Sequence, residues 1–410
     1  MHILWLKTEL LHPVDKGGRI RTYNMLRALR REHRVTYLTL DDGTAAPDAV
    51  AKAKEYCHEL VRIPFRTAPK GGARFFAELA RNLVSPLPYA VAKYRSAGMR
   101  KAVLEAVSGD VDVVVCDFLF PSLNVPDGLG VPTVMFQHNV EAMIWQRHAE
   151  VATGVKRVYM REQWRRMVRH ERAECRRFDH VVAVSPQDAA VFRRDFAITS
   201  VSDVPTGVDV DYFRPTGREP RRARNLVFTG SMDWMPNEDA ILWFADAILP
   251  LVRARVPDVT LTVVGRTPPA RIRALDGTAG IEVTGSVPDV RPYIERADVF
   301  VVPIRVGGGT RLKIFEAMAM ERPVVSTPVG AEGLPLRDGV DGLLAAEPQA
   351  FADAVVALLG DPARAAAMGQ AAAAHVRRDF GWDAVAARFA ETCAAVAAPG
   401  AGAAPVGAAG

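Results

Sequence analysis

Short, Val-rich apolar segments recur along the whole chain, and they constrain its fold more than any other feature. They occupy residues 2–7, 34–40, 60–65, 112–117, 132–137 and 180–185, and then 225–230, 260–265, 281–285, 298–304 and 323–328. Most of these segments are continuously apolar and do not alternate with polar residues. This pattern is typical of strands that are buried on both faces, as in parallel sheets covered by helices.

Helical patterns separate the apolar segments, as at residues 17–31, 140–177 and 362–396. Strand–helix alternation of this kind predicts an α/β protein with doubly wound sheets. A chain of 410 residues exceeds one typical core, so we expect two domains. The aperiodic Pro/Gly/Arg-rich stretch 214–224 predicts the linker between them. The expected parts are domains 1–213 and 225–380, a helix 381–396 that packs back across the hinge, and a disordered Ala/Gly/Pro tail 397–410.

Composition narrows the functional class. The net charge of +5 is mildly basic, which permits anionic partners without indicating nucleic acid, and no nucleic-acid-binding motif occurs. No apolar run approaches the length of a membrane span, and the first residues resemble a strand more than a signal peptide. The four cysteines are scattered, which is typical of reduced, buried thiols in a cytoplasmic protein.

The segment RVGGGTRLKIFEAM (305–318) carries the strongest chemical signal. Three glycines follow a predicted strand and precede a helix whose first turn contains Arg311 and Lys313. Cations oppose the helix dipole there, and a bound anion explains their position. The alternative is a glycine turn followed by a surface pair of Lys313 with Glu316. The spacing matches neither the Walker pattern nor the dinucleotide fingerprint.

Two further segments follow predicted strands. Gly17 and Gly18 precede a helix that carries Arg19 and Arg21, which is either a second anion-binding turn or a plain turn with surface arginines. His138 lies directly after the strand at 132–137 and is either structural or functional. Glu141, one turn later, is predicted to orient His138 or to cap the helix.

Several segments together resemble the retaining glycosyltransferases of family 4, which have the GT-B fold of two facing Rossmann-like domains with a cleft between them. They are residues 177–192, 205–215, 226–244, 285–303 and, most specifically, 297–334. The resemblance extends from Gly17 to about Leu344. It implies a hexosyltransferase that moves a sugar from a nucleotide-diphosphate sugar to an acceptor hydroxyl with retention. The implied enzyme needs no metal or cofactor and acts in polysaccharide or glycoconjugate synthesis.

The resemblance also implies roles for individual residues. Arg311 and Lys313 neutralise the diphosphate and act in catalysis together with His138, which faces the donor sugar. Glu316 accepts hydrogen bonds from the ribose hydroxyls. The remaining implied site residues are Gly18, Gly230, Val287, Gly308, Gly309 and Thr310 on the donor, and Gly17, Arg19, Arg21 and Glu141 on the acceptor or phosphate side.

One departure from the family pattern stands out. The family carries a pair of glutamates, and the first of them would fall at Gly308, eight residues before Glu316. The chain therefore fits a subset with a GGGTRLK…E motif better, as in sugar transferases of polysaccharide biosynthesis. Two alternatives stay open, a nucleotide-sugar 2-epimerase of the same fold and a non-catalytic nucleotide-binding homologue.

Two other patterns complete the expectations. The D-x-D tripeptides 110–112 and 209–211 resemble metal-binding motifs of a different glycosyltransferase fold, but their positions do not favour a metal site here. The stretches 66–101 and 156–177 are basic and interleaved with apolar residues. They predict either a solvated surface or peripheral contact with an anionic membrane that carries a lipid-linked acceptor.

Overall fold

The computed structural model describes residues 1–69, 71–306, 311–334 and 336–398. The chain forms two compact units. Unit 1 contains Met1–Pro205 and the chain from Val385 onward, and unit 2 contains Thr206–Ala384. The chain thus leaves unit 1 within the predicted N-terminal domain and returns to it within the last helix. The predicted linker 214–224 and the cleft between domains stay predictions.

Unit 1 is built on a seven-stranded parallel sheet of order β3-β2-β1-β4-β5-β6-β7. The strands are β1 His2–Lys7, β2 Arg34–Asp41, β3 Glu59–Pro64, β4 Val113–Asp117, β5 Thr133–Phe136, β6 His180–Ala183 and β7 Val201–Asp203. Strand β1 pairs with β2 on one side and with β4 on the other. The direction of winding therefore switches between β1 and β4, and ligands of doubly wound sheets bind at such a point.

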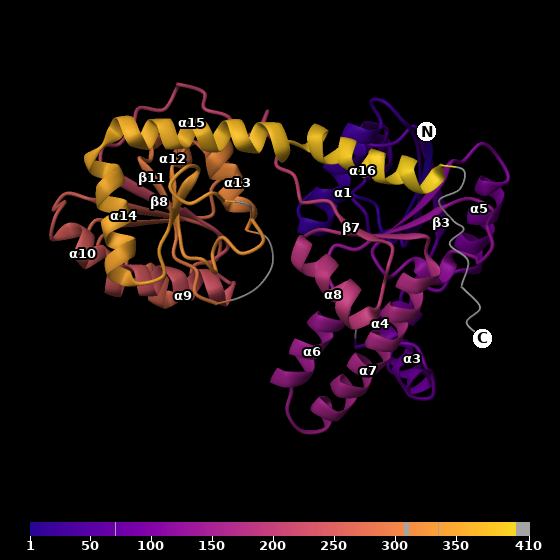
Figure 1. Ribbon diagram of the computed structural model, residues 1–410. Coiled ribbons are helices and arrows are strands. Elements are labelled where there is room, and N and C mark those ends of the chain that lie inside the picture. Colours follow the sequence, from indigo (N-terminus) through magenta and orange to yellow (C-terminus); the bar gives the residue numbers. More distant parts are fainter. Residues whose placement is uncertain (70, 307–310, 335, 399–410) are drawn as a thin grey trace, which may run out of the picture. The chain divides into compact units, whose positions relative to one another are not determined.

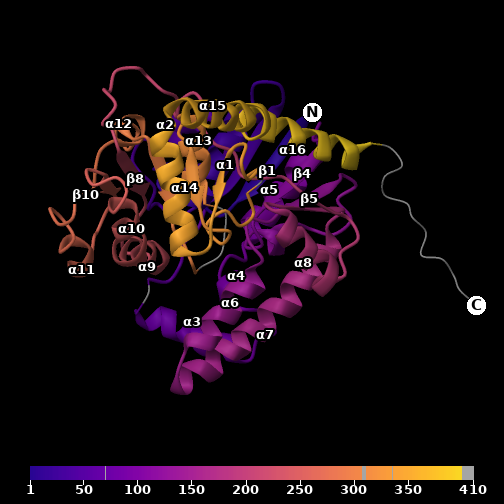
Figure 2. The ribbon, with the colours of Figure 1, turned by 60° about the vertical axis from the view of Figure 1, so that its left-hand side comes forward.

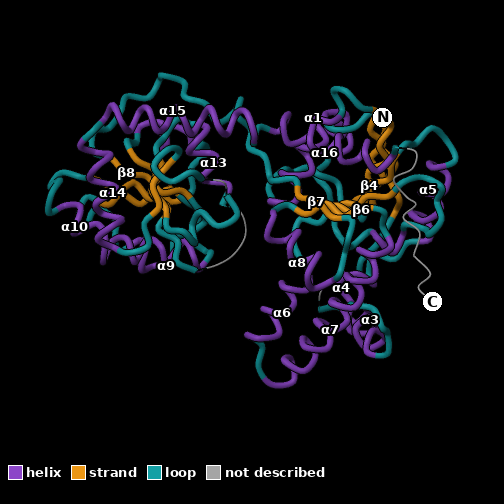
Figure 3. Tube along the Cα trace, in the orientation of Figure 1, coloured by secondary structure: helices purple, strands orange, loops and turns teal. Residues whose placement is uncertain are grey.

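Helices surround this sheet, as Figure 3 shows. They are α1 Gly17–Leu29, α2 Ala49–Lys52, α3 Ala73–Leu83, α4 Tyr89–Ala92, α5 Ala97–Val107, α6 Glu141–Val151, α7 Gly154–Arg177 and α8 Pro186–Phe196, with short 3-10 turns at Ala53–Glu55 and Ser122–Asn124. Local chemistry starts some of them. In α8, the Ser185 side chain accepts a hydrogen bond from the Asp188 N–H, and Pro186 occupies the first turn.

Unit 2 contains a six-stranded parallel sheet of order β10-β9-β8-β11-β12-β13, with its switch point between β8 and β11. The strands are β8 Asn225–Thr229, β9 Thr260–Val264, β10 Ile281–Gly285, β11 Val299–Val302, β12 Val324–Ser326 and β13 Gly342–Leu344. Its helical segments are α9 Met235–Trp243, a π-helical turn Phe244–Ile248, α10 Leu249–Arg253, α11 Ala270–Arg273, α12 Arg291–Arg296, α13 Leu312–Ala319, α14 Pro348–Gly360 and α15 Pro362–Asp379.

Buried strands supply the cores, as the sequence predicted. Every residue of β4, β8 and β11 is buried, because helices cover both faces of each sheet. The described chain ends in α16 Trp382–Ala397, whose Phe389 is fully buried against Trp5 and Phe136 of unit 1. All four cysteines are buried and form no disulfide.

The structure corrects some sequence-based boundaries. The helical stretch 140–177 is two helices, since α6 ends at Val151 and α7 begins at Gly154, which has a positive φ of 56°. The stretch 362–396 likewise divides into α15 and α16. The sequence missed β7 and β13, because strands of three residues carry little periodicity. Within the described residues, no helix combines the length and the apolar character that crossing a membrane requires.

Candidate active site

In unit 2, two glycines make room beside the switch point. Gly230 directly follows β8, and Gly265 follows β9. A Cβ at Gly265 would lie only 1.7 Å from the backbone oxygen of Gly230. A Cβ at Gly230 would lie 2.6 Å from the Lys313 Nζ and 2.7 Å from the Asn237 Nδ2. The missing side chains therefore let Lys313 and Asn237 approach the end of β8.

Lys313 lies in the first turn of α13 and points to this end of the sheet. Its Nζ donates a hydrogen bond of 2.9 Å to the Asn237 Oδ1 and lies 4.0 Å from the centre of the Phe228 ring. The side-chain amide of Asn237 donates a hydrogen bond to the backbone oxygen of Ser231. This hydrogen bond keeps the Asn237 Oδ1 directed toward Lys313. Burial lowers the pKa of Lys313 to about 7, although Glu316 opposes the shift. A lysine in this state gains charge when an anion binds.

Glu316 lies one turn further along α13 and shares this environment. Burial raises the pKa of its carboxyl group to about 7, while Lys313 acts in the opposite direction. The pKa of Lys313 is thus lowered and the pKa of Glu316 is raised, so the two values approach each other. Perturbed pairs of this kind cluster at functional sites, although structural ion pairs also produce them.

Arg311 immediately precedes α13 and is 5% exposed. Its guanidinium carbon lies 4.9 Å from the centre of the Trp234 ring. Burial lowers its pKa, with Glu332 acting against that shift. Val287 follows β10 and is partly buried against the core of unit 2. The predicted donor-binding residues Gly308, Gly309 and Thr310 lie outside the described residues.

In unit 1, the switch point holds a buried carboxylate that the sequence analysis did not single out. Oδ2 of Asp117, the last residue of β4, accepts hydrogen bonds from the Lys7 Nζ at 2.9 Å, the Thr22 hydroxyl at 2.6 Å and the Trp5 indole N–H at 3.0 Å. Asp117 is fully buried. Burial alone would raise its pKa, but Lys7 and His138 outweigh this and hold the pKa of Asp117 below its usual value.

His138 completes this group. Its Nε2 lies 2.8 Å from Oδ1 of Asp117 without hydrogen-bond geometry, and both ring nitrogens are buried without a hydrogen-bond partner among the described residues. Burial lowers the pKa of His138, with Asp117 acting against it, so the imidazole is neutral near pH 7. A neutral imidazole with unsatisfied ring nitrogens is suited to hydrogen bonding with a bound hydroxyl.

Phe118 has an unusual backbone conformation at the same place. Its φ of 72° lies in the left-handed region, which is unfavourable for a bulky residue and is found most often at functional sites. The centre of the Phe118 ring lies 3.9 Å from the centre of the His138 ring and 4.4 Å from the Lys7 Nζ. A Cβ at Gly18 would lie 3.0 Å from the Phe118 ring, whereas one at Gly17 would meet none of the described atoms within 4 Å.

The predicted arginines of α1 have different surroundings. Arg19 donates two hydrogen bonds to one Glu9 oxygen, at 2.9 and 2.6 Å, and one to Asp15, so its charge is already balanced. Arg21 is partly buried, and burial lowers its pKa to about 10, while Asp117 and Asp188 oppose that shift.

Glu141 is the first residue of α6 but does not cap that helix. The cap comes from α7, because the Glu171 carboxylate accepts hydrogen bonds of 2.8 Å from the backbone N–H groups of Glu141 and Ala142. Burial raises the pKa of Glu141 to about 7 and that of Glu171 to about 8. The alternative that Glu141 caps its own helix is therefore wrong.

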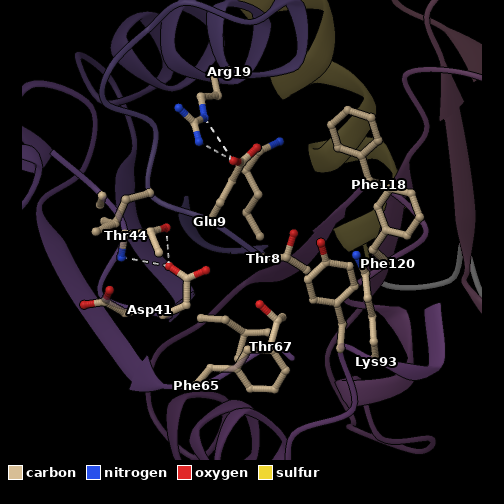
Figure 4. Close-up of a pocket in the computed structure, with 16 residues that line it drawn as sticks. Thr8, Glu9, Arg19, Asp41, Thr44, Phe65, Thr67, Lys93, Phe118 and Phe120 are labelled. Atoms are coloured by element: carbon tan, nitrogen blue, oxygen red, sulfur yellow. Dashed lines mark hydrogen bonds and ion pairs between the residues drawn. The ribbon is translucent and has the colours of Figure 1, made fainter. Parts of the chain in front are cut away.

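A pocket of about 280 Å³ opens at the carboxyl ends of β1 to β4, as Figure 4 shows. Phe65, Tyr94, Phe118 and Phe120 contribute aromatic rings to its lining, and Arg19 contributes together with Glu9. The ring planes of Phe118 and Phe120 form an angle of 20°, and those of Phe65 and Tyr94 form an angle of 24°, so each pair is stacked. The pocket thus combines an aromatic wall with polar groups, as sites for small ligands do.

The sequence carried a signal for the residues that its analysis missed. Lys7 is the charged last residue of β1 and directly follows four apolar residues, and Asp117 is the charged last residue of the otherwise apolar β4. Charged residues at the carboxyl ends of buried strands lie where ligands bind, so both qualified as candidates. Nothing local, however, indicated that β1 and β4 are neighbours.

No metal site is evident in the described part of the chain, where no group of three or more His, Cys, Asp or Glu side chains is placed to hold an ion. Three of the four D-x-D aspartates have structural partners. Asp110 pairs with His2 and Arg34, Asp112 accepts from the backbone N–H of His2, and Asp209 accepts from that of Tyr212. The expectation of metal-independent chemistry stays a prediction.

Two family models match the chain. Residues 16–212 match the model described as Glycosyltransferase Family 4, and residues 223–361 match the model described as Glycosyl transferases group 1. A D-inositol 3-phosphate glycosyltransferase of Arthrobacter sp. (strain FB24) is 32% identical over 53% of this chain and 57% of its own length. A phosphatidyl-myo-inositol mannosyltransferase of Mycobacterium tuberculosis is 32% identical over 48% of this chain. The matches span 57% and 55% of the lengths of these two relatives.

Solved structures share the fold at low identity. The Anabaena protein Alr3699/HepE in complex with UDP superposes with a TM-score of 0.67 at 15% identity, covering 96% of this chain and all of that one. Sucrose-phosphate synthase from Thermosynechococcus elongatus superposes with a TM-score of 0.62 at 20% identity, covering 95% of this chain and 98% of that one. At these identities the likeness shows the fold, and the fold is GT-B.

Proposed function

We propose that this chain, which matches the models described as Glycosyltransferase Family 4 and Glycosyl transferases group 1, transfers a glycosyl group from a nucleotide-diphosphate sugar to an acceptor hydroxyl. One observation carries the proposal: Arg311 and Lys313 lie partly or fully buried at the start of α13, and Lys313 reaches the end of β8 at the switch point. A buried lysine at a helix start is costly to charge without an anion, and a diphosphate is an anion that fits this position.

The proposed reaction breaks the bond between the anomeric carbon and the diphosphate oxygen. The electron pair leaves with the diphosphate, the acceptor oxygen bonds to the anomeric carbon, and the acceptor's proton passes to the departing phosphate. The transition state resembles an oxocarbenium ion. Lys313, Arg311 and the first N–H groups of α13 stabilise the negative charge that develops on the leaving group.

The other roles follow from the chemistry of each residue. Ionised Glu316 has only acceptor oxygens, which suits the ribose hydroxyls. His138 offers its unsatisfied Nδ1 to a hydroxyl near the transferred sugar. Retention of configuration by attack on the same face, without a metal ion, is part of the proposal. So is a place for the reaction in polysaccharide or glycoconjugate synthesis at the cytoplasmic side of a membrane.

A panel of nucleotide diphosphates and their sugars tests the proposal by thermal unfolding, starting with UDP and GDP. A ligand present at 100 times its dissociation constant adds about 2.7 kcal/mol to the free energy of unfolding. We expect Lys313→Met to lose this stabilisation and to cost about 2–4 kcal/mol in transition-state stabilisation. Lys54→Met, at an exposed lysine of unit 1, is the control. Nucleotide binding without turnover of any donor sugar would contradict the transferase.

We also propose peripheral contact with an anionic membrane through the basic stretches 66–101 and 156–177. Helices α3 and α6 and the first half of α7 project away from the sheet of unit 1 in both ribbon views (Figures 1 and 2). Large apolar side chains on or next to these helices are exposed, namely Phe76, Leu83, Val84, Val151, Val155 and Val158. Exposed apolar groups among basic ones are typical of membrane-surface binding. Co-sedimentation with phosphatidylglycerol vesicles but not with phosphatidylcholine vesicles is the expected result.

A further inference from the structure

A second cavity, of about 310 Å³, adjoins the aromatic pocket of unit 1. Phe65, Thr67 and Lys93 line both spaces, so these three residues form a shared wall. Figure 4 shows these three residues on the wall of the aromatic pocket. The second cavity lies between the segment after β3, the helix α3 and the segment around α4. A ligand in the aromatic pocket therefore lies next to the second cavity.

The second cavity is strongly basic. Its lining includes Arg66, Arg74, Arg81, Lys93 and Arg95, but only one carboxylate, that of Glu78. Glu78 is already engaged, because it accepts hydrogen bonds from the Arg74 Nε at 3.1 Å and from the Tyr89 hydroxyl at 3.0 Å. Within the described residues, Arg66, Arg81 and Arg95 make no ion pair. Several cations around one space whose single carboxylate is already engaged favour an anion there.

The aromatic pocket differs in its charge. Its three cations, Lys7, Arg19 and Lys93, are matched in number by three carboxylates. Arg19 pairs with Glu9 at 2.6 Å, and Lys7 with Asp117 at 2.9 Å. A neutral ring with hydroxyl groups suits this pocket, because its apolar face packs on aromatic rings while its hydroxyls meet the polar groups.

We infer that the acceptor carries a phosphate or diphosphate next to its hydroxylated ring. The ring occupies the aromatic pocket, and the phosphate occupies the basic cavity among Arg66, Arg81 and Arg95. The inference rests on the proposed function, since it names the acceptor class of the same transferase. Two sources supply this chemistry, a soluble sugar phosphate and a lipid-linked diphosphate.

The test measures binding of inorganic pyrophosphate to protein already saturated with UDP, so that the donor site is filled. Calorimetric titration should show binding to the wild type, weakened about tenfold in Arg81→Gln/Arg95→Gln through loss of charged hydrogen-bond donors. Arg100→Gln is the matched control, since Arg100 is an exposed arginine nearby that does not line the cavity. Thermal unfolding of each variant verifies that it is folded.

Two further ligands assign the source of the phosphate. Glucose 1-phosphate binding more tightly than farnesyl diphosphate indicates a soluble acceptor, and the reverse order indicates a lipid-linked one. UDP binding without any binding of pyrophosphate overturns the inference and leaves the proposed function standing. Equal affinity of the double variant and the wild type for pyrophosphate also overturns it. Failure of UDP itself to bind would instead contradict the proposed function.

Discussion

Lys313 is the single residue whose protonation should report donor binding. Its pKa of about 7 in the free protein means that it is largely uncharged at pH 8.5, where Glu316 is already ionised. A bound diphosphate favours the charged form and raises the pKa of Lys313. We therefore expect UDP binding at pH 8.5 to take up close to one proton, measured by calorimetry in two buffers of different ionisation enthalpy. Lys313→Met should abolish the uptake, and an uptake near zero in the wild type would remove Lys313 from the site.

Glu316 gives a second prediction, on stability. Its folded pKa of about 7 lies above the ordinary value of 4.5, so between these values the folded state holds a proton that the unfolded state has released. The stability of the wild type relative to Glu316→Gln is thus greatest below pH 4.5 and is lost as the pH rises to about 7. Urea unfolding of both proteins at pH 4 to 8 measures this difference. A difference that does not change with pH would show that Glu316 is not buried in its neutral form.

At the level of secondary-structure elements, the start of α1 and the end of β4 are coupled through Gly18 and Phe118. A methyl group at Gly18 meets the Phe118 ring, which in turn contacts the His138 ring. We expect Gly18→Ala to shift both rings and to lower kcat/KM about tenfold or more, because small displacements of catalytic groups are costly.

Gly17→Ala is the matched control for that substitution. It adds the same methyl group one residue earlier, where no described atom lies within 4 Å, and should lower kcat/KM less than Gly18→Ala does. Stability of both variants is measured by thermal unfolding, so that a rate effect is separated from unfolding. Wild-type kcat/KM in Gly18→Ala would mean that the contact between α1 and Phe118 does not position His138.

At the scale of the whole molecule, the last described helix packs against the first strand of the chain. Phe389 of α16 packs against Trp5 of β1 and Phe136 of β5, with ring centres 5.4 and 5.0 Å apart. Phe389→Ala leaves a cavity in that core and should lower the free energy of unfolding by about 3–5 kcal/mol, measured by chemical denaturation. Glu391→Ala, at an exposed position of the same helix, should change it little. Equal stability of the two variants would show that unit 1 does not depend on the last helix.

The sequence by itself determined the class of fold and predicted part of the candidate site. Continuous apolar segments alternating with helical ones specify buried parallel strands, since burial on both faces requires apolar side chains at every position. The segment 311–316 brings Arg311, Lys313 and Glu316 onto one short stretch through local spacing alone. Such features depend on residues near one another in the chain, and periodicity records them.

Only the tertiary structure decided which distant residues meet. Lys7 and Asp117 are 110 residues apart, and their contact depends on β4 lying beside β1, which no local pattern encodes. Gly230 and Lys313 likewise meet because β8 ends beside α13. The pKa values of Lys313, Glu316 and Asp117 follow from burial and neighbours, and the φ of Phe118 follows from the packing around it. These properties arise from contacts between segments far apart in the chain, so they appear only once the sheets are assembled.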